Sequence, residues 1–235
     1  SQSIADPGIE VLMSSPTVTN GSLGILNVNV GNYGNGDIVQ NSLTVVVSVG
    51  VNAEIIGVST GSDVRWTPFS LSTGSANTMK LTNSGGSFSS FDVSDILLNV
   101  RGTSVGDANG IIGNVVYITA NNPLLCVGCI TPPLNISQGN SDSTNDNSST
   151  SLSVIELPIS EDDINQTMVN TAVDGNVLIN DRDPMGGVLV VSTTPVSGPF
   201  NGSLVLNSNG TYTYTSNTGF IGVDTFIYEI CNNGN

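Results

Sequence analysis

Apolar residues along the chain alternate with polar ones or gather in short runs, and Gly, Asn and Ser interrupt them about every ten residues. Residues 26–30, Leu-Asn-Val-Asn-Val, show the period of two that is typical of a strand with one buried face. Residues 43–49 are more continuously apolar, which indicates a central strand. A helical period does not stand out in any segment, so the pattern predicts an all-β fold.

The first part of the chain contains seven candidate strands, which are enough for a β-sandwich. The Asn-Tyr-Gly-Asn-Gly stretch at 32–36 predicts a turn, because Gly and Asn tolerate a positive φ. The predicted strands cover residues 9–14, 23–30, 42–49, 54–58, 78–81, 95–100 and 113–119.

A polar segment separates these strands from the second part. Residues 135–148 contain almost nothing that a core would take up, so we expect a surface loop or mobile segment there. Apolar residues resume at 151–155, which alternate like a closing strand, and Pro158 follows. We therefore expect two tandem domains, residues 1–155 and 156–235.

Shorter strands are predicted in the second part, separated by Asp-Pro, Ser-Gly-Pro and Asn-Gly turns. Residues 211–215, Thr-Tyr-Thr-Tyr-Thr, place two tyrosines on one face and three threonines on the other, a pattern that indicates a half-buried strand. The predicted strands cover residues 171–173, 188–193, 202–206, 210–214 and 224–230.

The composition argues against several kinds of functional site. The chain has no His, four basic and 19 acidic residues, and a net charge of -15. This argues against a histidine triad, an imidazole metal site and binding to nucleic acid, which needs a basic surface. Because only 5% of residues are aromatic, we do not expect the aromatic-lined cleft of a hydrolase. Trp66 is expected in the core or at an edge, and a ligand-binding face is the alternative.

An apolar run of the ~20 residues that span a membrane is absent from the sequence, so we predict no membrane insertion.

Three cysteines are an odd number for an exported protein. Cys126 and Cys129 are predicted to close a small disulfide loop, which leaves Cys231 as the free thiol. A redox pair or half a zinc site is less favoured, because the sequence has no second pair and no His.

The second part resembles the bacterial cadherin-like Ig repeat of large surface adhesins. The resemblance rests on residues 175–184 (Gly-Asn-Val-Leu-Ile-Asn-Asp-Arg-Asp-Pro), 209–214 (Asn-Gly-Thr-Tyr-Thr-Tyr) and 219–228 (Gly-Phe-Ile-Gly-Val-Asp-Thr-Phe-Ile-Tyr). The repeats often carry Gly-Asp where Gly186 and Gly187 stand here. They also add one more strand, so the resemblance implies that domain 156–235 lacks its last strand, which a longer chain or a neighbouring subunit would supply.

The first part resembles the conserved-repeat Ig-like domains of giant adhesins that are exported by the type IX route and associated with gliding motility. This resemblance rests on residues 31–36, 91–97 and 145–152. It implies an extracellular, non-catalytic spacer or adhesive module on the bacterial outer surface. Asp142-Ser143-Thr144 resembles the O-glycosylation acceptor of bacteria that use this route, with Ser143 as the acceptor; a bare Ser/Thr loop is the alternative.

A calcium site is the most specific chemical prediction of the sequence, because clustered carboxylate oxygens suit a hard cation. The candidate ligands are Glu161, Asp162, Asp163, Asp181 and Asp183. Acidic and amide side chains in turns also cap their own backbone, and this alternative stays open. Asp224 is expected to be such a turn residue.

Two functions are compatible with these patterns. The first is a structural and adhesive module of a surface fibre, whose partners are neighbouring repeats, identical subunits or a cell-surface or substratum polymer. The second is a lectin-like domain that binds glycans, which needs an exposed aromatic patch or a concave polar pocket.

Overall fold

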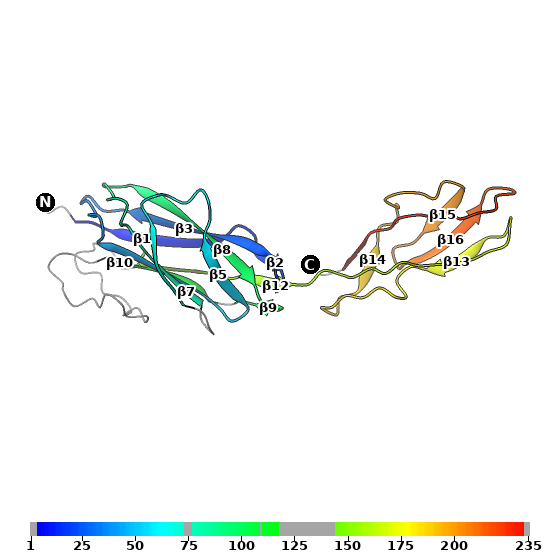
Figure 1. Ribbon diagram of the computed structural model, residues 1–235, viewed down its shortest axis with the longest axis horizontal. Helices are drawn as coiled ribbons and strands as arrows, with labels where there is room; N and C mark the ends of the chain where they lie inside the picture. Colours follow the sequence, from blue (N-terminus) through cyan, green and yellow to red (C-terminus); the bar gives the residue numbers. More distant parts are fainter. Residues whose placement is uncertain (1–3, 73–76, 109, 118–143, 233–235) are drawn as a thin grey trace. The chain divides into compact units, whose positions relative to one another are not determined.

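A computed structural model describes residues 4–72, 77–108, 110–117 and 144–232 of the chain. Every regular element in these ranges is a β-strand, which confirms the predicted all-β fold. The chain divides into two compact units, unit 1 (Ser1–Ile155) and unit 2 (Glu156–Asn235), which Figure 1 shows as two groups of strands. Each unit is described by itself below.

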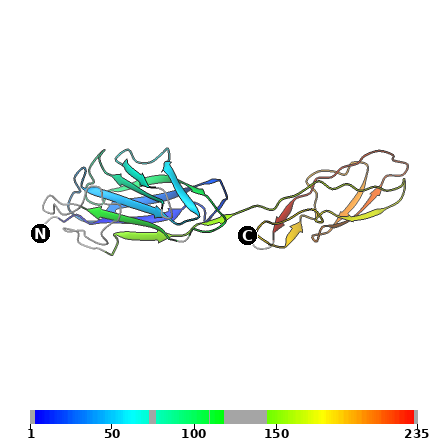
Figure 2. The same ribbon diagram turned by 60° about the horizontal axis from the view of Figure 1, so that its bottom comes forward.

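Two sheets stack face to face in unit 1, and most of their strands lie along a common axis, pointing one way or the other (Figure 2). The first has the order β1-β3-β8-β5 and the second the order β11-β10-β4-β7-β6, while β2, β12 and β9 form a small third sheet. All pairs are antiparallel except β2 with β12. The strands are β1 (Pro7–Met13), β2 (Thr17–Thr19), β3 (Leu23–Asn32), β4 (Leu43–Val49), β5 (Ala53–Val58), β6 (Thr67–Ser72), β7 (Asn77–Thr82), β8 (Val93–Gly102), β9 (Gly106–Asp107), β10 (Ile111–Tyr117), β11 (Asn147–Thr150) and β12 (Ser153–Ile155).

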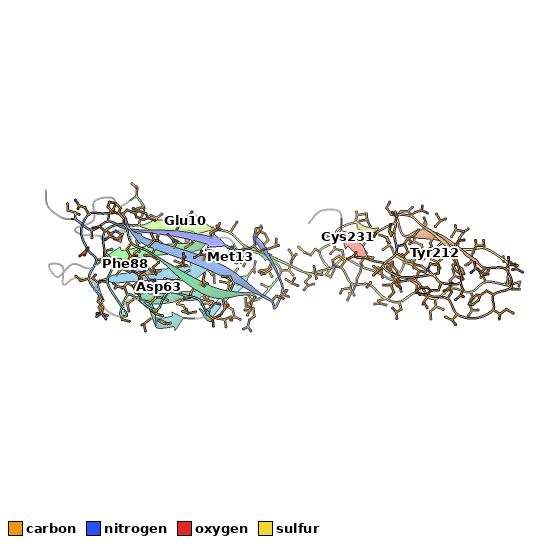
Figure 3. All side chains as sticks on the ribbon, turned by 90° about the horizontal axis from the view of Figure 1, so that it is seen from above. Glu10, Met13, Asp63, Phe88, Tyr212 and Cys231 are labelled. Atoms are coloured by element: carbon orange, nitrogen blue, oxygen red, sulfur yellow. The ribbon has the colours of Figure 1, made fainter. Side chains whose placement is uncertain are left out.

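The core of unit 1 follows from period-two alternation. On β1, Met13 is buried and Glu10 is exposed, and Figure 3 labels both side chains. Alternate residues of β3 and β4 fill the space between the two sheets. Trp66 is a core residue, because its ring contacts Phe88 and its Nε1 donates a hydrogen bond of 2.7 Å to Ser94 Oγ.

Edge strands β1 and β11 approach each other and close one side of unit 1. The Ile9 amide donates to the Asn145 carbonyl at 2.9 Å, and the Val11 amide donates to Ser148 Oγ at 3.1 Å. The predicted polar loop 135–148 is therefore wrong at its end, where Asp146 is buried and β11 begins at Asn147. Backbone pairing with β10, rather than burial of apolar side chains, makes this polar segment a strand.

Unit 2 has a three-stranded sheet, β13-β16-β15, and a two-stranded sheet, β14-β17. Four side chains form its buried core: Val177, Val191, Leu206 and Tyr212. Tyr212 is labelled in Figure 3. Tyr214, Phe226 and Tyr228 are among the partly buried side chains that pack against this core. The strands are β13 (Val173–Asn176), β14 (Leu189–Val191), β15 (Gly202–Leu206), β16 (Thr211–Ser216) and β17 (Ile230–Asn232).

Two predicted strands of unit 2 are misplaced. Residues 171 and 172 precede β13, which starts at Val173, and most of 224–230 lies outside a regular strand. The segment before β17 forms an isolated bridge between Ser197 and Ile227, and its Glu229 carbonyl accepts the Ser192 amide at 3.1 Å. The reason is local: the Asp224 side chain accepts the amides of Phe200 and Asn201, which replaces strand pairing at that point.

Candidate functional site in the acidic part of unit 2

The Tyr228 hydroxyl brings two of the predicted calcium ligands together. Its oxygen lies 2.9 Å from Asp163 Oδ2 and 3.3 Å from Asp181 Oδ2. The carbonyl oxygens of Glu161 and Val177 each lie 3.2 Å from the same hydroxyl. A hydroxyl has one proton to donate, so it cannot satisfy all of these acceptors at once.

The protonation of this cluster is perturbed. Burial raises the pKa of the Asp163 carboxyl; the hydrogen bond from Tyr228 opposes this effect, and the charges of Asp181 and Asp162 reinforce it. Burial, followed by the hydrogen bond to Asp163, raises the pKa of Tyr228 as well. The tyrosine therefore remains a hydrogen-bond donor at neutral pH.

Backbone contacts hold segment 161–163 against the turn that carries Asp181. The Glu161 amide donates to Asp181 Oδ1 at 2.8 Å, and Asn180 Nδ2 donates to the Asp162 carbonyl at 3.1 Å. Ile159 and Arg182 form a two-way backbone bridge beside these contacts. Glu161 and Asp162 thus take part through their main chain.

Asp183 points to other partners. Its Oδ1 accepts the Met185 amide at 2.9 Å, and its Oδ2 accepts the Gly187 amide and Asn232 Nδ2, each at 2.9 Å. The hydrogen bond from Asn232, followed by that from the Met185 amide, lowers the pKa of Asp183. A Cβ on Gly187 would lie 2.3 Å from Asp183 Oδ2, so a side chain at this position would require the Asp183 carboxylate to move.

Asp224 has the role that the sequence predicts for it. Its carboxylate accepts the amides of Phe200 at 2.9 Å and Asn201 at 2.8 Å, and the Tyr214 hydroxyl at 2.9 Å. Burial alone would raise the pKa of Asp224, but the bonds from the Phe200 and Asn201 amides and from Tyr214 outweigh it, so this pKa is lowered.

The predicted calcium ligands do not come together in one cluster. Within the ranges that the structure describes, no three Asp, Glu or Cys side chains gather around one point where a metal ion would sit. Asp163 and Asp181 supply carboxylates and Glu161 and Val177 supply carbonyls, which is fewer than the six to eight oxygen atoms that calcium takes. The Tyr228 hydroxyl is the group that these oxygens surround, and the calcium site stays a prediction.

A hollow of about 420 Å³ lies beside this cluster. Its lining combines carboxylate and amide side chains with the exposed residues Ile164 and Ile179, and it contains no basic residue. The lining residues are Asp162, Asp163, Ile164, Asn165, Gly175, Asn176, Ile179, Asn180 and Tyr212.

Three other predicted site residues lie outside the described ranges. They are Cys126 and Cys129, the predicted disulfide, and Ser143, the predicted glycosylation acceptor. Cys231 is described, and it is a free and exposed thiol on β17, labelled in Figure 3.

Sequence reasoning missed an ionic cluster in unit 1. The Arg65 guanidinium contacts Asp63 Oδ2 at 2.6 Å and Asp92 Oδ2 at 2.5 Å, and its Cζ lies 4.1 Å from the centre of the Phe88 ring. Asp63 and Phe88 are labelled in Figure 3. The hydrogen bond from Arg65 lowers the pKa of Asp63. The run Asp63-Val64-Arg65-Trp66, with opposite charges two residues apart, was a signal for this pair.

Comparison with known families finds one match, to unit 2. Residues 155–235 match the family model of the bacterial Ig domain. No curated relative matches the chain's sequence. The match covers unit 2 and supports the Ig-like part of the predicted resemblance.

Solved structures give weaker likenesses. The CARDB domain of the PF1109 protein from Pyrococcus furiosus, in complex with di-metal ions, is 15% identical over 66% of this chain and 98% of its own, with a TM-score of 0.39. A non-cellulosomal cohesin from Archaeoglobus fulgidus is 17% identical over 48% and 80%, with a TM-score of 0.33. The CBM3 of Hungateiclostridium clariflavum is 9% identical over 43% and 75%, with a TM-score of 0.32. Scores this low carry no inference about ligands or partners.

Proposed function

We propose that the chain is a non-catalytic structural and adhesive module on the outer surface of a bacterium. The observation that carries this proposal is the match of residues 155–235 to the bacterial Ig domain. Neighbouring repeats or identical subunits, together with a cell-surface or substratum polymer, are the proposed partners. Export by the type IX route in a gliding bacterium belongs to the same proposal and rests on the resemblance of unit 1.

The acidic side chains of unit 2 support a structural role. Asp183 accepts two backbone amides of its own turn and the side chain of Asn232 on β17, and Asp224 accepts two amides of the loop before β15, so both carboxylates fix loop segments of unit 2. A catalytic carboxylate, in contrast, has to face a substrate. None of the described segments forms a helix long and apolar enough to cross a membrane.

The test is surface labelling of the bacterium that produces the chain. An antibody raised against residues 156–235 should label intact cells, and external protease should remove the signal. The purified 235-residue chain, added in excess, should slow attachment of these cells to a surface. Label that appears only after the cells are permeabilised would contradict the proposal.

A further inference from the structure

The outer face of the β11-β10-β4-β7-β6 sheet carries polar side chains in register. Leu43, Val45, Val47 and Val49 of β4 are buried in the core, so Thr44 and Ser48 lie on the opposite side of the sheet. The same alternation holds on the neighbouring strands. We call this surface the neutral face; its members are Thr44, Val46, Ser48, Thr78, Lys80, Thr82, Ile112, Asn114, Asn147 and Ser149.

This face differs in charge from the rest of the protein. None of its residues is acidic, although the chain has 19 acidic residues, and Lys80 is its one charged member. The outer face of the β1-β3-β8-β5 sheet, in contrast, carries Glu10, Glu54 and Asp95. Two of these acidic groups have partners within the sheet, because Arg101 pairs with Glu54 and Asn29 Nδ2 donates to Asp95 Oδ1 at 2.9 Å.

Hydrogen-bonding groups on the neutral face remain available. Within the described ranges, six of its side chains make no hydrogen bond to other protein groups: Thr44, Ser48, Thr82, Asn114, Asn147 and Ser149. Strand geometry spaces such groups by about 4.8 Å across strands and about 6.8 Å along them. The sheet therefore presents a regular array of hydroxyl and amide groups.

The chemistry of this array selects its partner. Val46, between Asn114 and Lys80 in register, is only 4% exposed, and Ile112 is the exposed large apolar member, so the face offers little of the apolar area that a protein interface buries. Its single positive charge does not suit an anionic polymer, which the net charge of -15 repels. Hydroxyl and amide groups both donate and accept, and so do the hydroxyls of a sugar. Because one such bond contributes little and the face is not a pocket, a ligand has to bridge several groups at once.

We propose that the neutral face binds an uncharged polysaccharide in an extended chain form, laid across β10, β4 and β7. This deepens the proposed adhesive function and rests on it, since it names the polymer class that the module holds. The hydroxyls of Thr44 and Thr82, which are opposite each other in register, and the amide of Asn114 are the specificity-determining groups.

Native affinity electrophoresis of the 235-residue chain tests the proposal. Gels containing hydroxyethylcellulose, an uncharged extended polymer, should retard the chain, and gels containing alginate, an anionic one, should not. The variant Thr44→Val/Thr82→Val/Asn114→Leu keeps the strand preference and removes three polar groups, so its affinity should fall at least about tenfold. The matched control Asn99→Leu, on the other sheet, should be retarded like the parent chain.

Several results would overturn the inference. They are equal retardation of the triple variant and the parent, loss of retardation in Asn99→Leu, retardation by alginate alone, or no retardation by hydroxyethylcellulose. Thermal melts of both variants separate loss of binding from loss of folding. Surface labelling of cells does not depend on any of these gels, so a failure here is distinguishable from a failure of the proposed function.

Discussion

The two units hold themselves together in different ways. Among the residues that the structure describes, unit 1 buries 27 apolar side chains in one cluster and unit 2 buries four, although unit 1 is only about twice as long. Unit 2 leaves Ile164, Ile179 and Val223 more than four-fifths exposed. In compensation, Asp224 and Tyr228 bind backbone groups that are 23 and 51 residues away in the sequence, and Asp183 binds backbone amides of its own turn.

The difference shows which interactions a small sandwich relies on. Apolar burial is insensitive to protonation, so the stability that the large apolar core gives unit 1 should not change with pH. Single polar groups matter in unit 1 where they are fully buried and hydrogen-bonded, as Asn32 and Asn83 are. A scaffold of carboxylate hydrogen bonds is titratable, and removal of one acceptor leaves several donors without partners. Unit 2 should therefore respond to polar substitutions and to acid.

The largest effect is expected from Phe88→Ala. Phe88 is fully buried between Trp66 and Arg65, so its removal leaves a cavity and should cost unit 1 about 3–5 kcal/mol in unfolding free energy. Urea unfolding followed by tryptophan fluorescence reports on unit 1, which holds the single Trp. Phe91→Ala, at a side chain that is 73% exposed, is the control and should change the free energy by about 0.5 kcal/mol or less. Equal losses in both variants would contradict the apolar-core account.

Asp224→Ala should have the next largest effect, confined to unit 2. It removes the acceptor of the Phe200 and Asn201 amides and of the Tyr214 hydroxyl, which should cost about 1–3 kcal/mol. Tyr214→Phe removes one of these bonds and should cost less. The amides of Phe200 and Asn201 should exchange faster in the Asp224 variant by hydrogen exchange. Unchanged protection of both amides would show that the carboxylate does not fasten this loop.

Acid should weaken unit 2 below about pH 4. The pKa values of Asp183 and Asp224 are lower in the folded state, so their stabilisation is present above the unfolded value of about 3.9 and is lost as the pH falls through the folded value. Asp163 acts in the opposite sense, because its raised pKa lets the folded state take up a proton first and offsets part of the loss. Unfolding free energies of unit 2 between pH 7 and pH 3 measure the slope. The slope should flatten in Asp224→Asn, and an identical slope would count against this cause.

Calcium is expected to give the smallest effect. If Glu161, Asp162, Asp163, Asp181 and Asp183 gather an ion with water, calcium at one to ten times its dissociation constant stabilises unit 2 by about 0.4–1.4 kcal/mol. Magnesium should stabilise it less, because it needs a smaller and more rigid octahedral site. Thermal melts with calcium, magnesium and chelator make the comparison. Identical melting curves with calcium, magnesium and chelator would show that these residues do not bind calcium.

Regular alternation made much of the fold predictable. The predicted strand 23–30 is found as Leu23–Asn32, and 202–206 coincides with Gly202–Leu206. The short or polar strands Thr17–Thr19, Gly106–Asp107 and Asn147–Thr150 were not predicted, because backbone pairing rather than side-chain periodicity defines them.

The candidate site was predictable only in part. The spacing of the acidic residues indicates that they lie near one another, and Asp163 and Asp181 do share the Tyr228 hydroxyl. Tyr228 stands 65 residues from Asp163, and local sequence does not reveal a contact over such a separation. The same holds for Asn232, whose amide takes Asp183 away from the cluster.

Separate folding of the two units tests the central claim most directly. Two-dimensional amide spectra of residues 1–155, of residues 156–235 and of the 235-residue chain should be recorded under one condition. The account predicts dispersed spectra for both segments, whose peaks superimpose on those of the whole chain, and a loss of dispersion on acidification that begins in 156–235. A disordered spectrum for residues 1–155 alone, or a single transition that both units share in the whole chain, would contradict it.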